Sequence, residues 1–137
     1  MTKNLRSINP SEHQIQAAIV EWARRTKLDN EYRVGDFLIK QANEGKRSWN
    51  VGKKMKKEGL TAGVSDLFLA LPVKATEKVS KKERFFGGMW IEVKSKKGKL
   101  SYKQAMWITT MSQNYICLVV DEVDDGIQAI KDYLRMR

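Results

Sequence analysis

The 137-residue chain contains only one cysteine and one histidine. A single cysteine excludes an internal disulfide framework and a thiolate metal cluster, and a single histidine excludes a multi-histidine zinc site. Cys117 lies in an apolar run, which favours a buried, inert thiol. No apolar run approaches the roughly 20 residues of a membrane-spanning helix, and the first residues lack the apolar core of a signal peptide. We therefore expect a cytoplasmic protein with no membrane partner.

Acidic residues are also scarce relative to basic ones. Lys and Arg total 26 against 16 Asp and Glu, which gives a net charge of +10. This imbalance favours a polyanionic partner, either DNA or RNA, with an anionic membrane surface as the rival. A hydrophobic content of 42% and four tryptophans indicate a folded chain of a length typical of one domain. We expect a flexible N-terminus at 1–10 and a single domain at 11–137.

Hydrophobic periodicity and turn residues predict the order helix, strand, helix, strand, strand, helix, strand, helix. The helices are expected at 12–27, 48–59, from 101 onward and 121–137, and the strands at 32–42, 67–71, 89–94 and 115–120. Capping-box patterns begin at Ser11 and Ser101. The apolar run 115–120 is typical of a strand covered on both faces, whereas 74–87 resembles a long polar loop, either mobile or functional. The fold class is α/β, with a mixed sheet flanked by helices.

Asp66 and Glu92 lie at the ends of two strand-like runs, and Lys94 follows Glu92 two positions later. Glu92 and Lys94 share a face, because successive side chains of a strand alternate between faces. If the two strands pair antiparallel, Asp66 lies near both. Neighbouring carboxylates repel and are relieved by a hard cation, so Mg²⁺ or Mn²⁺ fits a chain without soft ligand clusters. The alternative is a surface ion pair at the strand ends.

Polar side chains also fall on two otherwise apolar helix faces. Glu12 and Gln16 occur at helical spacing with Ile15 and Ile19. Glu12 either joins a metal shell or, as an acid at the first helical position, favours the helix dipole. Gln104 either hydrogen-bonds the site or acts only as the third residue of its capping box. The sequence leaves both choices open.

Basic residues gather around the short helix, in the polar loop and beside the Glu92–Lys94 strand. Such runs usually form solvated faces, but the third group borders the acids and favours phosphate contact. Ser101 would contribute backbone N–H donors at the start of its helix. The expected nucleic-acid contacts are Lys46, Arg47, Lys53, Lys96, Lys97, Lys99 and Ser101. The basic residues of the polar loop are Lys74, Lys78, Lys81, Lys82 and Arg84.

Five short motifs occur in order along the chain. They are Ser11-Glu12-x-x-x-Gln16, Asn43-x-Gly45-Lys46-Arg47-Ser48, Gly63-Val64-Ser65-Asp66-Leu67, Ile91-Glu92-Val93-Lys94 and Gly98-x-Leu100-Ser101-x-x-Gln104. In this order they resemble a stand-alone VRR-NUC domain, a branch of the PD-(D/E)xK nuclease superfamily. The resemblance spans about residues 11–130 and implies a restriction-endonuclease-like sheet. Ser65 departs from the proline that the family often has there, and 73–87 is longer than usual.

The resemblance also implies roles for individual residues. Asp66 and Glu92 would bind Mg²⁺ or Mn²⁺, helped by the Val93 carbonyl, and Lys94 would be the catalytic lysine. Glu12 and Gln104 would complete the site, Glu12 through water. The implied reaction is phosphodiester hydrolysis.

Stand-alone members of this family are similar to phage and bacterial nucleases that cut four-way DNA junctions as homodimers. We therefore expect a structure-selective DNA endonuclease in the cytoplasm of a bacterial or phage-infected cell, with two sites related by a two-fold axis. DNA shape should then dominate over base readout. The alternatives are a flap- or restriction-type nuclease of the same fold and a basic nucleic-acid-binding module without catalysis.

Overall fold

The computed structural model describes residues 9–41, 53–54, 56–59 and 61–137. A four-stranded sheet forms the centre, in the order β1-β2-β5-β6. Its strands are β1 (Leu38–Lys40), β2 (Leu67–Leu69), β5 (Met89–Val93) and β6 (Ile116–Val120). β1, β2 and β5 pair antiparallel, and β5 and β6 pair parallel. The predicted mixed sheet is therefore confirmed, including the parallel pair.

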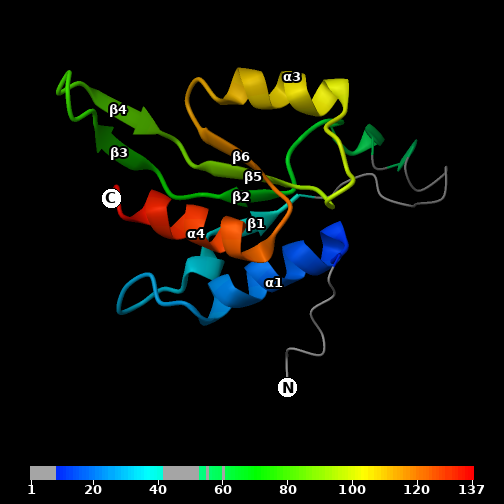
Figure 1. Ribbon diagram of the computed structural model, residues 1–137, viewed down its shortest axis with the longest axis horizontal. Helices are drawn as coiled ribbons and strands as arrows, with labels where there is room; N and C mark the ends of the chain where they lie inside the picture. Colours follow the sequence, from blue (N-terminus) through cyan, green and yellow to red (C-terminus); the bar gives the residue numbers. More distant parts are fainter. Residues whose placement is uncertain (1–8, 42–52, 55, 60) are drawn as a thin grey trace.

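Three helices cover the two faces of this sheet. They are α1 (Glu12–Arg25), α3 (Tyr102–Met111) and α4 (Val123–Leu134). α1 and α4 lie on one side, and α3 lies on the other (Figure 1). The helix α3 connects β5 to β6, which is the crossover that a parallel pair requires. This arrangement confirms an α/β fold of the restriction-endonuclease-like type.

Alternation along β2 and β5 separates the two faces of the sheet. Leu67, Ile91 and Val93 are completely buried on the α1 and α4 side. On the α3 side, the Phe68 and Trp90 rings stack with their centroids 4.2 Å apart. β5 is therefore buried along its whole length, so any charged group on it is removed from bulk water.

Both predicted capping boxes begin helices. Ser11 accepts the Gln14 N–H at 3.1 Å, and Gln14 Oε1 accepts the Ser11 N–H at 2.8 Å. α1 ends two residues before the predicted limit, where Thr26 is extended. Half of the predicted helix 48–59 lies outside the described residues; within the other half, 53–54 and 56–57 are helical. The predicted flexible segment 1–10 also falls outside them, apart from its last two residues.

The prediction of a loop over 74–87 was wrong. These residues form a hairpin of β3 (Val73–Thr76) and β4 (Glu83–Phe86), paired antiparallel as a separate two-stranded sheet. The hairpin extends away from the central sheet, so both of its faces are largely solvated (Figure 1). A strand solvated on both faces does not show the apolar alternation that marks a half-buried strand.

The strand predicted over 32–42 is shorter than expected. Only Leu38–Lys40 forms β1, and a 3-10 turn, η2 (Val34–Asp36), precedes it. Asp36 accepts the Arg33 N–H at 2.7 Å and stabilises this turn. Gly35 packs against the α1 backbone, where a Cβ would lie 2.8 Å from Arg24 Cα. Close approach to α1 therefore replaces the first half of the expected strand.

The expectation that 115–120 would be covered on both faces was also wrong. β6 is an edge strand, and of Ile116–Val120 only Val120 is buried. Val119 is 46% exposed and lies on the α3 side, opposite Glu92 in the register. No helix in the described part of the chain is long and apolar enough to span a bilayer.

Candidate active site

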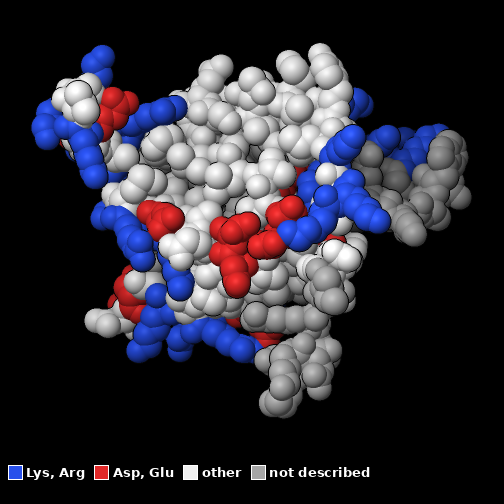
Figure 2. Space-filling view, viewed as in Figure 1, with Lys and Arg blue, Asp and Glu red and all other residues white. Residues whose placement is uncertain are grey.

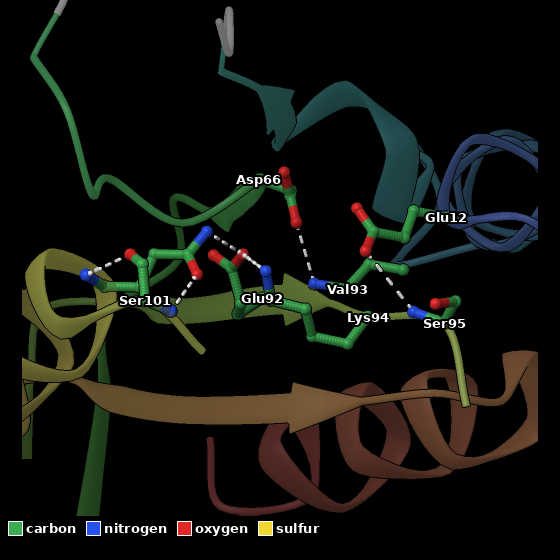
Figure 3. Close-up of polar contacts among 8 residues, drawn as sticks. Glu12, Asp66, Glu92, Val93, Lys94, Ser95 and Ser101 are labelled. Carbon is green, nitrogen blue, oxygen red and sulfur yellow. Dashed lines mark hydrogen bonds and ion pairs between the residues drawn. The ribbon is translucent and has the colours of Figure 1, made fainter. Parts of the chain in front are cut away.

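The antiparallel register of β2 and β5 brings two acids together. Leu67 pairs with Ile91, which places Asp66 beside Glu92 at the end of the sheet. Asp66 is 5% exposed and Glu92 is 2% exposed. Asp66 Oδ2 accepts the Val93 N–H at 2.7 Å (Figure 3). The proximity predicted from the antiparallel pairing is therefore present, and deep burial excludes a surface ion pair.

Glu92 is the most perturbed acid of this site. Desolvation raises the pKa of Glu92 from 4.5 to about 7, and the neighbouring Asp66 charge adds to the rise. The Lys94 ammonium opposes it, with Nζ 3.8 Å from Glu92 Oε1. The Ser65 hydroxyl also opposes it, without a hydrogen bond of normal geometry. Glu92 Oε2 is buried and has no hydrogen-bond partner within the described residues.

Gln104 combines the two roles that the sequence left open. Its backbone N–H donates to Ser101 Oγ at 3.1 Å, and its side-chain Oε1 accepts the Ser101 N–H at 2.9 Å, which completes the capping box. The amide Nε2 of the same side chain donates to Glu92 Oε1 at 2.9 Å. The cap of α3 thus fixes the donor that orients Glu92.

Glu12 lies at the start of α1 and faces the end of β5. Its Oε1 accepts the Ser95 N–H at 3.4 Å (Figure 3). Its charge adds a small contribution to the raised pKa of Glu92. Gln16 is 3% exposed on the same helix and lines a separate cavity of about 280 Å³ with His13 and Lys40.

The donor set of this site suits a hard cation. The described residues contain no cluster of three or more Asp, Glu, His and Cys side chains that could hold a metal. Asp66 and Glu92 would therefore supply two carboxylates, with main-chain oxygen and water completing the shell, as Mg²⁺ prefers. The buried Glu92 Oε2 without a hydrogen-bond partner fits this assignment, because a buried anionic oxygen is costly unless it has a cationic or donor partner.

The basic residues beside the site are not equivalent. Lys97 and Lys99 are exposed, whereas Lys96 pairs with Glu122 and lies 3.9 Å from Asp121 Oδ1. Lys96 stays an expected phosphate contact, but these two acids compete with a phosphate for its ammonium. The signal in the sequence was the acidic pair directly after β6, since parallel strands end at the same edge of a sheet.

The structure describes only some of the remaining residues that we expect to contact nucleic acid. Ser101 caps α3, so its helix begins beside Glu92. Lys53 is exposed on helical backbone. Lys46 and Arg47 lie outside the described residues. The main-chain contacts of Val93 and Ser95 to the acids were missed because a backbone N–H leaves no mark in the sequence.

Comparisons with known proteins agree with this geometry. The model of the VRR-NUC domain family matches residues 8–124. A solved structure described as a VRR_NUC domain protein is similar, with a TM-score of 0.71 and 20% identity over 94% of this chain and 92% of that one. At this identity the likeness concerns the fold. No curated protein matches the chain.

The family match covers most of the chain and includes Glu12, Asp66, Glu92, Lys94 and Gln104. It implies a nuclease-type function, with DNA as the substrate class. The chain therefore belongs to the VRR-NUC domain family.

Proposed function

We propose that this chain is a Mg²⁺- or Mn²⁺-dependent endodeoxyribonuclease that selects branched DNA and resolves four-way junctions as a homodimer. The observation that carries the proposal is the buried pair of Asp66 and Glu92. Their burial raises the pKa of Glu92 to about 7, and a divalent cation would relieve the repulsion between the two groups.

Asp66, Glu92 and the Val93 carbonyl would hold the cation. When bound, Mg²⁺ or Mn²⁺ supplies charge stabilisation at a phosphoryl oxygen and lowers the pKa of bound water. The protein keeps the ligands in place: the Val93 N–H holds Asp66 Oδ2, and Gln104 Nε2 holds Glu92 Oε1. Hydrogen bonds of this kind to a metal-binding carboxylate fix its orientation.

Lys94 is the cationic group of this site. Its side chain is 14% exposed, so it is largely covered but still reaches solvent beside Glu92. From this position its ammonium would orient the attacking water or stabilise negative charge that develops on the phosphate. Glu12, held by the Ser95 N–H, would act at the same edge through water.

The homodimer is supported by an apolar area on the side of the sheet that carries α3. No residue of α3 is buried, Met106 is 48% exposed and Val119 on β6 is 46% exposed. Figure 2 shows that the part of the molecule over α3 is largely without charged side chains. In a chain of net charge +10, a second copy meets less repulsion at such an area than at the basic areas of the surface.

The test compares cleavage by the wild-type chain and by Asp66→Asn on four-way junction, flap and linear duplex with Mn²⁺. Asparagine keeps an oxygen that accepts the Val93 N–H but removes the negative charge. We expect junction cleavage by the wild-type chain and none by Asp66→Asn, with DNA binding largely retained. Equal cutting of linear duplex and junction would contradict junction selectivity, and undiminished cutting by Asp66→Asn would contradict the assigned site.

Oligomeric state is tested separately by sedimentation. We expect a dimer for the wild-type chain and a monomer for Val119→Lys. A wild-type monomer that still resolves junctions would contradict the dimer.

A further inference from the structure

The hairpin β3–β4 extends from the end of the sheet where Leu69 pairs with Met89, whereas the acid pair lies beyond the other end of this register, beside Leu67 and Ile91. Figure 1 shows the hairpin projecting from the central sheet. The base of the hairpin is anchored in the main core rather than in the acid pair. Val73 is 4% exposed and Phe86 is 7% exposed, and both belong to the main core. Tyr133 Oη of α4 donates to the Leu71 carbonyl at 2.7 Å just before β3. The hairpin therefore leaves the core from a fixed origin.

The tip of the hairpin, residues 77–82, has a defined conformation. The Glu77 N–H donates to the Lys82 carbonyl at 2.9 Å, and the Lys81 N–H donates to the Glu77 carbonyl at 3.0 Å. Lys81 closes the turn with a φ of +59°, in the left-handed region that few side chains adopt. This geometry presents the side chains of the tip to solvent in a preorganised arrangement.

Basic residues outnumber acidic residues in the hairpin. Its two acids are engaged within it: Glu77 accepts from Ser80 Oγ at 2.6 Å, and Glu83 pairs with Lys74 at 2.8 Å. The tip lysines are all exposed and have no acidic partner in the described part of the chain; they are Lys78, Lys81 and Lys82. Basic side chains surround this protrusion in Figure 2. Three like charges within one short turn repel, and a polyanion would relieve this repulsion.

We propose that the β3–β4 hairpin is a DNA-contacting arm whose tip lysines bind backbone phosphates of a duplex segment away from the cut. The inference rests on the proposed nuclease function and adds a second contact region to it. The backbone takes ten residue steps from Lys82 to Glu92, and these span at most ~33 Å at ~3.3 Å per step. At ~3.4 Å per base pair, the arm therefore reaches phosphates within about ten base pairs of the site.

The test compares Lys78→Gln/Lys82→Gln with Lys27→Gln/Lys131→Gln. Each variant removes two exposed lysine charges, the first pair from the tip and the second from α1 and α4 surroundings. Lys81 is left unchanged because of its left-handed backbone. Binding to a junction with arms of about 20 base pairs is measured in an Asp66→Asn background from about 50 to 200 mM salt. Cleavage is measured with Asp66 intact.

We expect Lys78→Gln/Lys82→Gln to weaken binding by roughly tenfold or more and to reduce the slope of log K against log salt by about 1.8, because two phosphate contacts are lost. The control pair should change neither quantity comparably. The difference between the two variants should shrink on junctions with arms of about five base pairs, because a shorter arm offers the tip fewer backbone phosphates. Circular dichroism checks that both variants fold.

Equal binding by the two variants on long arms would overturn the arm while leaving the nuclease proposal intact. Loss of binding to phosphatidylserine vesicles with unchanged DNA binding would also overturn it, in favour of a membrane contact. Absence of cleavage by the wild-type chain would instead overturn the nuclease proposal. The two failures are therefore distinguishable.

Discussion

Gln104 and Glu92 are joined by a hydrogen bond of 2.9 Å from Nε2 to Oε1, while the other end of the Gln104 amide caps α3 through Ser101. The position of an acid in the site therefore depends on the first turn of a helix. Gln104→Glu can keep the cap, because a glutamate oxygen also accepts the Ser101 N–H, but it removes the donor to Glu92. Gln104→Ala removes both.

We expect both Gln104 variants to lose junction cleavage by at least tenfold, because Glu92 loses the donor that orients it. Only Gln104→Ala should also lose stability, by about 1 kcal/mol, through the lost cap. Cleavage rates and urea unfolding measure the two effects. Wild-type cleavage by Gln104→Glu would show that Gln104 serves the cap alone.

The raised pKa of Glu92 predicts how stability depends on pH without metal. Between pH 4.5 and about 7, the folded chain holds a proton on Glu92 that the unfolded chain has released. The free energy of unfolding therefore decreases as pH rises through this window, by up to about 3 kcal/mol from this group. Urea unfolding in EDTA measures the slope. In Glu92→Gln this contribution should vanish, and identical slopes for the two proteins would contradict it.

Addition of metal should reverse this loss. A cation that binds only the folded state stabilises it by about 2.7 kcal/mol at a concentration of a hundred times Kd. We expect Mn²⁺ to raise the Tm of the wild-type chain at pH 8 and to leave Asp66→Asn unchanged. Thermal unfolding with and without EDTA measures the shift. An equal shift in both proteins would place the stabilising metal elsewhere.

Lys94 should affect cleavage more than folding. We expect Lys94→Met to reduce the cleavage rate by roughly 10²- to 10³-fold, the usual effect of removing one group that stabilises transition-state charge. Methionine keeps much of the covered stem, so the urea midpoint at pH 5, where Glu92 is protonated, should change little. Near-wild-type cleavage by Lys94→Met would remove Lys94 from the proposed chemistry.

Tyr133 provides a test of the anchor beneath the hairpin. Its hydroxyl donates to the Leu71 carbonyl within the core, and the residue is 1% exposed. We expect Tyr133→Phe to lower the free energy of unfolding by about 1 to 3 kcal/mol, because a buried carbonyl loses its partner. Unchanged stability in urea unfolding would mean that Leu71 finds another donor.

The sequence predicted the acid pair well because two independent arguments, strand alternation and strand pairing, agreed. Strand alternation placed Glu92 and Lys94 on one face, and antiparallel pairing of β2 with β5 brought Asp66 to the same end. Capping boxes marked the starts of α1 and α3 because Ser and Gln must be three residues apart to satisfy each other. These are local rules, and the structure follows them.

The sequence was less informative where tertiary contacts decide which residues form strands, which are exposed and which pair. The hairpin has polar residues on both faces, so no alternation distinguished it from a loop, and its turn uses Lys81 rather than glycine at positive φ. The exposure of Val119 depends on β6 lying at the edge of the sheet, which an apolar run does not reveal. The pairing of Lys96 with Glu122 likewise required the parallel alignment of β5 and β6.

The most direct test of the proposed metal site is a crystal of the chain grown with Mn²⁺ and measured for anomalous scattering. We expect a peak about 2.1 Å from carboxylate oxygens of both Asp66 and Glu92, as for a hard divalent cation with oxygen ligands. The absence of a peak between these two carboxylates, at a Mn²⁺ concentration that supports cleavage, would contradict the account.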